Sequence, residues 1–175
     1  PIELAIFGAG TYQPMTAGGF TPDAVRHTIE TNLMGVVHGM AAVLPSMRGR
    51  RSGQLACIAS VAGYRGLPKA AAYGASKAAL INMAESLRPE LELEGVRISV
   101  INPGFVETPM TAQNDFPMPF LMQPEAAASR ILSGLEKGPF EIAFPRRFVA
   151  LLKFARILPY GLYFRLVRRF VLPRN

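Results

Sequence analysis

The chain has 175 residues, of which 50% are hydrophobic and 18% charged. This composition is typical of one folded domain and excludes a disordered segment. No uninterrupted run of about 18 apolar residues occurs, so no membrane-spanning helix is predicted. Cys57 is the only cysteine, which excludes an internal disulfide and a cysteine-built zinc site and favours a reducing, cytoplasmic location. The two histidines, His27 and His38, lack metal-ligand spacing, so no metal site is expected.

The net charge of +7 is concentrated at one end of the chain. Residues 145–175 contain eight basic side chains and no acidic one, which leaves 11 basic and 12 acidic residues in 1–144. The eight are Arg146, Arg147, Lys153, Arg156, Arg165, Arg168, Arg169 and Arg174. Because the body of the chain is close to neutral, we do not expect a nucleic acid as a partner.

The chain opens with a predicted strand and a predicted long helix. Residues 4–7 form a short apolar run that ends at Gly8-Ala9-Gly10, the pattern of a buried strand followed by a glycine-rich loop. Thr21 followed by Pro22 predicts the start of a helix. That helix is expected to run to about residue 47, with a bend at Pro45.

The remaining elements alternate between strands and helices. In chain order they are a strand at 54–59, a helix at 70–93, a strand at 96–101, a helix at 124–136 and a strand at 140–144. This alternation indicates parallel crossovers, so the expected fold class is α/β. Sites in open parallel sheets form beyond the carboxyl ends of the strands, which here are Gly8-Ala9-Gly10, Ser60 and Asn102-Pro103-Gly104.

Tyr73 and Lys77 lie four residues apart near the start of the helix at 70–93, so both side chains share one face of it. A free phenol has a pKa of about 10 and is a poor proton donor or acceptor at neutral pH. A nearby ammonium is expected to lower that pKa, and Ser60 is placed to hold a carbonyl or hydroxyl against the phenol. The alternative for the pair alone is an exposed tyrosine beside a solvated lysine.

Several strings surround this pair in a fixed order. They read Glu30-Thr31-Asn32-Leu33-Met34-Gly35, Ile58-Ala59-Ser60-Val61-Ala62-Gly63, Tyr73-Gly74-Ala75-Ser76-Lys77 and Val100-Ile101-Asn102-Pro103-Gly104-Phe105-Val106-Glu107-Thr108. In order and spacing they resemble the short-chain dehydrogenase/reductase family over nearly the whole chain, from residue 4 to about residue 144. The resemblance implies a doubly wound, Rossmann-like parallel sheet and NAD or NADP as cofactor.

The resemblance also implies a role for each matching residue. Tyr73 would be the general acid/base, Lys77 would lower its pKa and bind the nicotinamide ribose, and Ser60 would orient the substrate carbonyl. Asn32 would hold a water that links Lys77 to solvent. The cofactor-binding residues would be Gly10, Tyr73, Lys77, Pro103, Gly104, Val106 and Thr108. Each role has a structural alternative, in which Asn32 bonds to backbone, Ser60 caps a turn and residues 102–104 form a common turn.

Two features depart from the family pattern. The strand-end Asn-Ala-Gly of the family is Gly8-Ala9-Gly10 here, so an asparagine that ties strand backbones together is missing. The family's phosphate loop, Thr-Gly-x-x-x-Gly-x-Gly, has no match, and the chain starts Pro-Ile-Glu without Met. We therefore expect residues 1–144 to be the catalytic half of the fold, with the first strands encoded but absent from this piece. Alone it should turn over little, and its strand at 4–7 should expose an apolar edge.

Residues 145–175 are expected to form a basic extension with short helices at 146–158 and 161–171. In the second helix four apolar side chains fall on one face and three arginines on another. The apolar four are Tyr163, Leu166, Val167 and Phe170. Such a helix either lies on an anionic membrane surface or packs on the body as a lid over the substrate site, and the sequence favours packing.

The resemblance implies an NAD(P)-dependent oxidoreductase that interconverts an alcohol and a carbonyl. The Met-, Phe- and Pro-rich stretch at 105–122 is expected to cover the substrate, and its character predicts a small apolar one. The helices at 22–47 and 70–93 resemble the pair through which family members form homodimers or homotetramers. The alternative is a truncated, non-catalytic module that acts through its oligomer surface or its basic tail.

Overall fold

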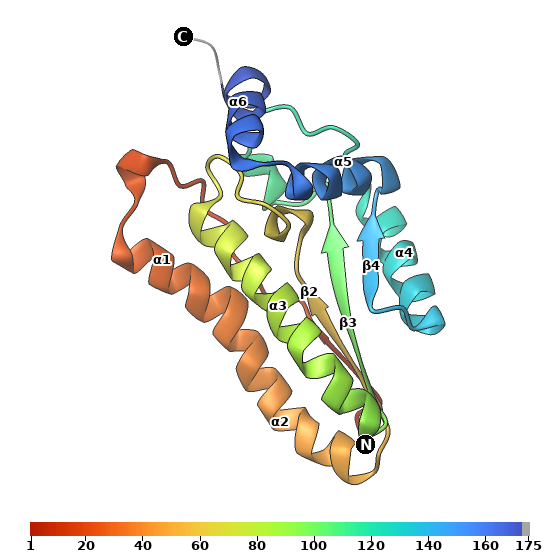
Figure 1. The fold of residues 1–175 in the computed structure, drawn as a ribbon. Helices are drawn as coiled ribbons and strands as arrows, with labels where there is room; N and C mark the ends of the chain where they lie inside the picture. The colour runs from red at the N-terminus through yellow and green to blue at the C-terminus, as the bar shows by residue number, and fades with distance from the viewer. Residues whose placement is uncertain (173–175) are drawn as a thin grey trace.

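The computed structural model describes residues 1–172, and its centre is a four-stranded parallel sheet in the order β1-β2-β3-β4 (Figure 1). The strands are β1 (Leu4–Phe7), β2 (Gly53–Ile58), β3 (Val96–Pro103) and β4 (Glu141–Phe144). Each strand pairs in parallel with the one that follows it in the chain. The predicted α/β class is therefore confirmed.

Helices cover both faces of this sheet and its carboxyl end (Figure 1). One face carries α1 (Pro22–Ile29), α2 (Gly35–Gly49) and α3 (Ala71–Leu93), and the other carries α4 (Pro124–Lys137). Beyond the carboxyl ends of β3 and β4 lie α5 (Arg146–Ile157) and α6 (Tyr160–Phe170). Short helical turns occur at Ala17–Gly19, Val61–Gly63 and Thr111–Gln113.

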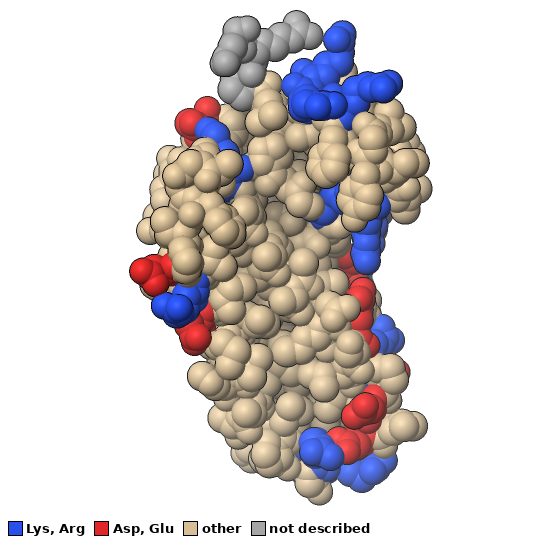
Figure 2. Space-filling model, turned by 60° about the vertical axis from the view of Figure 1, so that its left-hand side comes forward, with Lys and Arg blue, Asp and Glu red and all other residues tan. Residues whose placement is uncertain are grey.

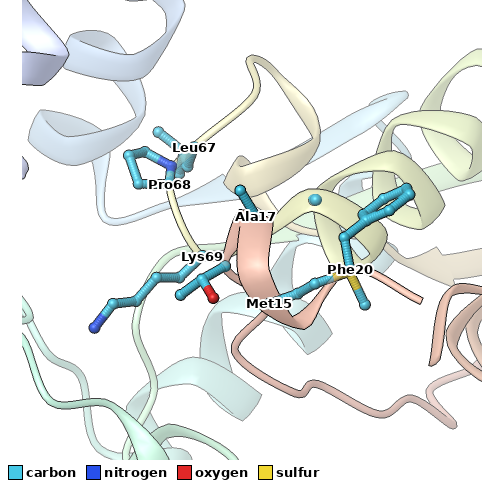
Figure 3. A pocket seen from close by; sticks show the side chains of 8 residues that line it. Met15, Ala17, Phe20, Leu67, Pro68 and Lys69 are labelled. Atoms are coloured by element: carbon cyan, nitrogen blue, oxygen red, sulfur yellow. The ribbon is translucent and has the colours of Figure 1, made fainter.

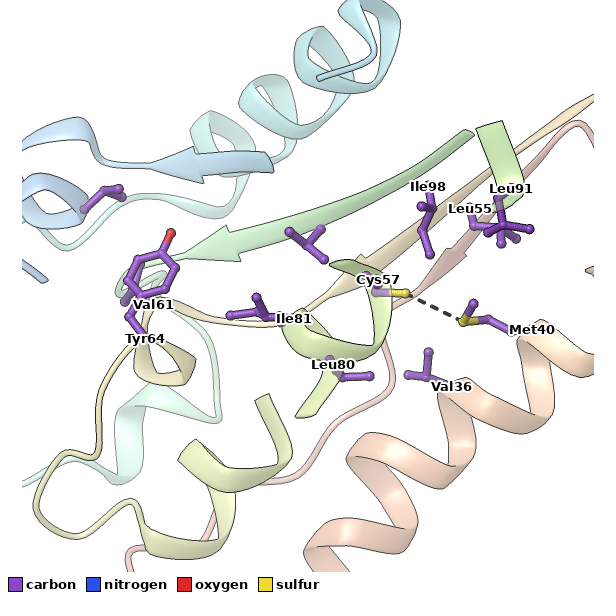
Figure 4. Close-up of a cluster of buried hydrophobic side chains, with 14 of the residues drawn as sticks. Val36, Met40, Leu55, Cys57, Val61, Tyr64, Leu80, Ile81, Leu91 and Ile98 are labelled. Carbon is purple, nitrogen blue, oxygen red and sulfur yellow. Dashed lines mark hydrogen bonds between the residues drawn. The ribbon is translucent and has the colours of Figure 1, made fainter. Parts of the chain in front are cut away.

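The core is divided between the two faces of the sheet because side chains alternate along each strand. In β2, Leu55 and Cys57 are fully buried on the side of α2 and α3, whereas Ala56 between them packs on the side of α4. Figure 4 shows the Cys57 sulfur pointing toward the Met40 sulfur of α2, 4.0 Å away. Burial on both faces explains why the strands read as uninterrupted apolar runs.

The helix predicted from residue 22 to about 47 runs continuously from Pro22 to Gly49, but its middle is not α-helical. Residues Glu30–Met34 form a π-helical turn between α1 and α2. Thr21 caps the start as predicted, since its hydroxyl accepts a hydrogen bond from the Ala24 amide at 3.3 Å. Pro45 lies inside α2 without ending it. The other predicted boundaries agree with the structure within two residues.

Within residues 1–172, β1 is an edge strand of the sheet. Its Ala5 and Phe7 pack on the core, whereas Leu4 and Ile6, on the opposite face, are 40% and 44% exposed. This is the exposed apolar edge expected from the sequence. The division of the chain into a unit at 1–144 and an extension at 145–175 stays a prediction. No helix in the part of the chain described is long and apolar enough to cross a membrane.

Candidate active site

The carboxyl ends of β1, β2 and β3 and the first turns of α3 lie along one rim of the sheet (Figure 1). Ser60 follows β2 and caps the turn Val61–Gly63, its hydroxyl accepting a hydrogen bond from the Ala62 amide at 3.1 Å. The same hydroxyl lies 3.5 Å from the carbonyl oxygen of Pro103, at the end of β3. Ser60 therefore caps a turn and also presents a hydroxyl at the predicted rim.

Tyr73 and Lys77 project from successive turns of α3 toward this serine. The Ser60 hydroxyl lies close enough to the Tyr73 phenol to lower the pKa of Tyr73, and the Lys77 ammonium lies 5.6 Å from the centroid of the Tyr73 ring. A Cβ added at Gly63 would lie 2.8 Å from the backbone of Lys77, so the turn after Ser60 packs directly on this part of α3. The three predicted side chains are thus brought together.

The pKa of Tyr73 is shifted in the opposite direction from the one expected from the sequence. Burial raises the pKa of Tyr73, the nearby Ser60 hydroxyl lowers it, and Tyr12 raises it further, so that the net direction is upward. The prediction that Lys77 lowers this pKa is wrong for this structure. Lys77 as a whole is 4% exposed, its ammonium donates to the Ile58 carbonyl at 2.8 Å, and burial lowers its own pKa to about 8.

Asn32 lies fully buried in the π-helical turn, where it binds the loop after β1. Its side-chain oxygen accepts from the Thr11 amide at 2.7 Å, and its nitrogen donates to the Thr11 carbonyl at 2.9 Å and to the Ser76 hydroxyl at 3.0 Å. A Cβ added at Gly10 would lie 3.6 Å from both the Asn32 oxygen and the Lys77 nitrogen. The backbone-bonded alternative for Asn32 is therefore present, and Gly10, Asn32 and Lys77 are neighbours.

The segment after Pro103 lies against the start of α5 and the segment before α4. Gly104 allows a close approach there, since an added Cβ would lie 2.9 Å from the Phe148 ring. Val106 forms an isolated parallel bridge with Met122, and the Thr108 amide donates to a threonine hydroxyl three residues further on at 2.9 Å. The predicted residues of this segment therefore lie in one folded loop at the rim.

A hollow of about 500 Å³ adjoins the start of α3 (Figure 3). Its walls come from the loop before α1 and from the loop that leads into α3, and they are mostly apolar. The labelled side chains are Met15, Ala17, Phe20, Leu67, Pro68 and Lys69. Ala71, two residues before Tyr73, also lines it, so the hollow is close to the rim that holds the polar side chains.

Two features of the site were missed from the sequence. Tyr12 packs edge-on against Tyr73, with ring centroids 5.1 Å apart. Glu141 accepts hydrogen bonds from Asn102 at 2.9 Å, from the Tyr64 hydroxyl and from Lys153. Burial acts to raise the Glu141 pKa, but these hydrogen bonds outweigh it and the pKa is lowered. Glu141 is the only polar residue of β4, and a single acidic residue in an otherwise apolar strand was the sequence feature that could have identified it.

The match to a known protein family covers the part of the chain that carries these motifs. The sequence profile of the family described as short chain dehydrogenase matches residues 1–117. The chain belongs to this family. The resemblance drawn from the strings around Asn32, Ser60, Tyr73 and Asn102 is therefore confirmed.

Among curated short-chain dehydrogenase relatives, the chain is 40% identical over 168 residues to an uncharacterized oxidoreductase of Myxococcus xanthus, covering 96% of this chain and 66% of that protein. It is 33% identical over 146 residues to the ketoacyl reductase HetN of Nostoc, covering 81% and 51%. The structure of a short chain dehydrogenase from Burkholderia cenocepacia in complex with NADP is similar with a TM-score of 0.82 at 26% identity, covering 98% and 70%. The chain thus spans less than two thirds of these curated relatives' length, by a narrow margin for the first.

Proposed function

We propose that residues 1–175 supply the catalytic side of an NAD(P)-dependent oxidoreductase that interconverts an alcohol and a carbonyl. The observation that supports this most strongly is that Ser60, Tyr73 and Lys77 lie near one another, after β2 and in the first turns of α3. A hydroxyl, a phenol and an amine that lie close together can hold a carbonyl oxygen and exchange a proton with it. None of the three groups performs redox chemistry.

The missing redox chemistry is a hydride transfer, which a bound nicotinamide supplies. Gly10 is a neighbour of the Asn32 oxygen and the Lys77 amine, since an added Cβ would lie 3.6 Å from each, and the proposal places the nicotinamide ribose beside it. In this proposal Gly10, Tyr73, Lys77, Pro103, Gly104, Val106 and Thr108 would hold it. The NADP in the Burkholderia relative supports a dinucleotide, and either NAD or NADP fits the proposal.

In the reducing direction, Ser60 holds the substrate carbonyl oxygen by a hydrogen bond and Tyr73 donates its phenolic proton to that oxygen. Because burial raises the pKa of Tyr73, the phenol keeps this proton at neutral pH until charge develops on the substrate oxygen. Lys77 then stabilises the phenolate by its charge, provided that its ammonium turns from the Ile58 carbonyl toward the ring. Asn32 holds the loop around Gly10 in place and is proposed to position a water behind Lys77.

The proposed substrate is small and apolar. The hollow beside the start of α3 has mostly apolar walls, and the side chain of Lys69 at its edge is paired with Asp115 at 2.7 Å. The name of the Nostoc relative, a ketoacyl reductase, supports a carbonyl next to an aliphatic chain. A cytoplasmic location and a homodimer or homotetramer built through α1–α2 and α3 belong to the same proposal.

The test is the substitution Tyr73→Phe in the gene product that contains residues 1–175. Loss of the proton donor is expected to reduce NADPH-dependent reduction of aliphatic ketones by roughly 100-fold or more, the usual contribution of a general acid. Thermal stabilisation by NADP should persist, because the ring remains in place. The measurement is NADPH absorbance together with the unfolding temperature.

The matched control is Tyr160→Phe, which removes a hydroxyl from an exposed ring far along the chain and should leave turnover unchanged. Unaltered turnover after Tyr73→Phe would contradict the mechanism. Absence of any stabilisation by NAD or NADP would instead favour the second candidate, a non-catalytic module acting through its surface.

A further inference from the structure

The two C-terminal helices expose an unusual amount of apolar surface. Of the eighteen large hydrophobic residues exposed in the described part of the chain, nine lie between residues 151 and 172. They are Leu151, Phe154, Ile157, Tyr160, Leu162, Phe164, Phe170, Val171 and Leu172, and we call them together the α5–α6 surface. Ile157, Tyr160 and Phe170 are each at least 70% exposed, so packing on the body covers only part of these helices.

The α5–α6 surface is nevertheless firmly attached to the body. Phe148 and Leu152 of α5 are buried in the core, and the hydroxyl of Tyr163 in α6 donates to the Gly66 carbonyl. The Arg65 guanidinium lies over the rings of Tyr160 and Tyr163, 4.5 and 4.4 Å from their centroids. The exposed side chains therefore belong to helices that are held in place on the body of the protein.

Positive charge accompanies these apolar side chains. Within residues 1–172, six arginines of the two helices form no ion pair. They are Arg146, Arg147, Arg156, Arg165, Arg168 and Arg169. Figure 2 shows a group of basic side chains at the upper end of the molecule, where α6 lies in Figure 1, next to a surface without charge. No acidic residue occurs from residue 145 onward.

We propose that the α5–α6 surface docks on an anionic lipid bilayer. Exposed aromatic and aliphatic side chains beside unpaired arginines are the complement of a membrane interface, which offers apolar depth under a layer of negative headgroups. The helices have 12 and 11 residues, too short to span a bilayer, so they would lie in its plane. Leu151, Ile157 and Leu162 distinguish this surface from a nucleic-acid site, which has no use for exposed aliphatic chains.

Docking through this surface turns the carboxyl end of the sheet toward the lipid, because both helices lie at that end (Figure 1). The rim with Ser60 and Tyr73 would then face the phase in which an apolar substrate is concentrated. The binding itself does not rest on the proposed catalysis, and it is measured without a substrate or a cofactor.

The experiment is flotation of the gene product that contains residues 1–175 with vesicles of two compositions. One is phosphatidylcholine alone, and the other is phosphatidylcholine mixed with phosphatidylserine. The protein is expected to float with the mixed vesicles, to stay behind with phosphatidylcholine alone, and to dissociate as the salt concentration rises.

Two sets of substitutions separate the apolar and the charged contributions. Phe154→Ser with Ile157→Ser removes apolar side chains, and Arg165→Gln with Arg168→Gln and Arg169→Gln removes three charges. The triple variant should bind the mixed vesicles on the order of 100-fold more weakly, at about fivefold for each basic side chain near an anionic surface. All substituted side chains are exposed, so circular dichroism should show an unchanged fold.

The matched control is Leu132→Ser with Arg130→Gln in α4, where Leu132 is 58% exposed and Phe154 is 57% exposed. This variant should float as the unchanged protein does. The proposal is overturned if the unchanged protein fails to float with phosphatidylserine vesicles, or if both variant sets float as well as the control. It is also overturned if an oligonucleotide or a second copy of the chain occupies the same surface and vesicles do not.

Discussion

Lys77 is the residue at which stability and the proposed chemistry oppose each other most directly. Its amine is almost completely buried, makes one hydrogen bond to a backbone carbonyl, and has a pKa lowered to about 8 by burial. At neutral pH the folded chain therefore holds a charge that water would solvate better. The nearby phenol of Tyr73 is buried too, so the proposed proton donor and the amine that would stabilise its phenolate are both kept away from solvent.

The substitution Lys77→Met is expected to stabilise the fold while removing the proposed activity. A pKa lowered from 10.5 to about 8 means that the buried charge destabilises the fold by about 3 kcal/mol. The substitution removes this penalty but also loses a hydrogen bond that contributes about 1 kcal/mol, so the net gain in stability at pH 7 is about 2 kcal/mol. Since the folded pKa is the lower one, charge burial destabilises the native state below pH 8 and this penalty fades as the pH rises toward 10.5. Urea unfolding at several pH values measures it.

The exposed Lys137→Met is the control, and it should shift stability by no more than a few tenths of a kcal/mol at any pH. A Lys77→Met protein that is less stable than the original at pH 7 would show that the amine is better solvated in the native state than its burial indicates.

Among the elements, the π-helical turn Glu30–Met34 has the clearest structural consequence. It lies between two regular α-helices and contains Asn32, whose side chain bonds both backbone groups of Thr11 and the hydroxyl of Ser76. These contacts join the loop after β1 to α3 through one side chain. A turn of this kind interrupts a helix where a residue is needed in a particular direction, and such turns are frequent at functional sites.

Asn32→Ala is therefore expected to lower the free energy of unfolding by about 2 kcal/mol, because the partly buried Thr11 backbone groups and the Ser76 hydroxyl would lose their partner. The measurement is chemical denaturation. Asn82→Ala, an exposed asparagine of α3, is the control and should cost far less. Equal losses for the two variants would mean that Asn32 does not hold the loop.

At the scale of the whole molecule, the sheet is covered unevenly. Both faces of β2 and β3 are buried, whereas β1 has one exposed face and one edge that pairs with nothing within the part of the chain described. An apolar strand with free hydrogen-bonding groups is a template for association with other chains. Residues 1–175 expressed alone are therefore expected to aggregate through this strand.

Ile6→Lys should slow this aggregation, because a charge on the exposed face of β1 opposes strand pairing between chains. Light scattering of residues 1–175 over time provides the measurement. Leu132→Lys places the same charge on an exposed side chain of α4 and should have no such effect. Identical aggregation of both variants would place the association elsewhere.

Much of this arrangement could be predicted from the sequence, because it depends on local patterns. Apolar runs, Thr21 as a cap and the spacing of Tyr73 and Lys77 each act within a few residues, and they gave the right elements and the right neighbours. The π-helical turn was missed because it changes hydrogen bonding without changing the pattern of side chains. The direction of the Tyr73 pKa was missed because it depends on burial and on Tyr12, which only tertiary packing decides.

The position of Arg65 links the far end of the chain to its middle. Its side chain lies over Tyr160 and Tyr163 and donates to the carbonyl oxygens of Arg156 and Leu158, while its backbone belongs to the loop that runs from Ser60 to α3. Truncating the protein before α6, as is often done when an aggregation-prone terminus hampers purification, would remove the rings of Tyr160 and Tyr163. The loop between Ser60 and Tyr73 would then lose its contacts with these rings, so truncation would also be expected to disturb the candidate active site.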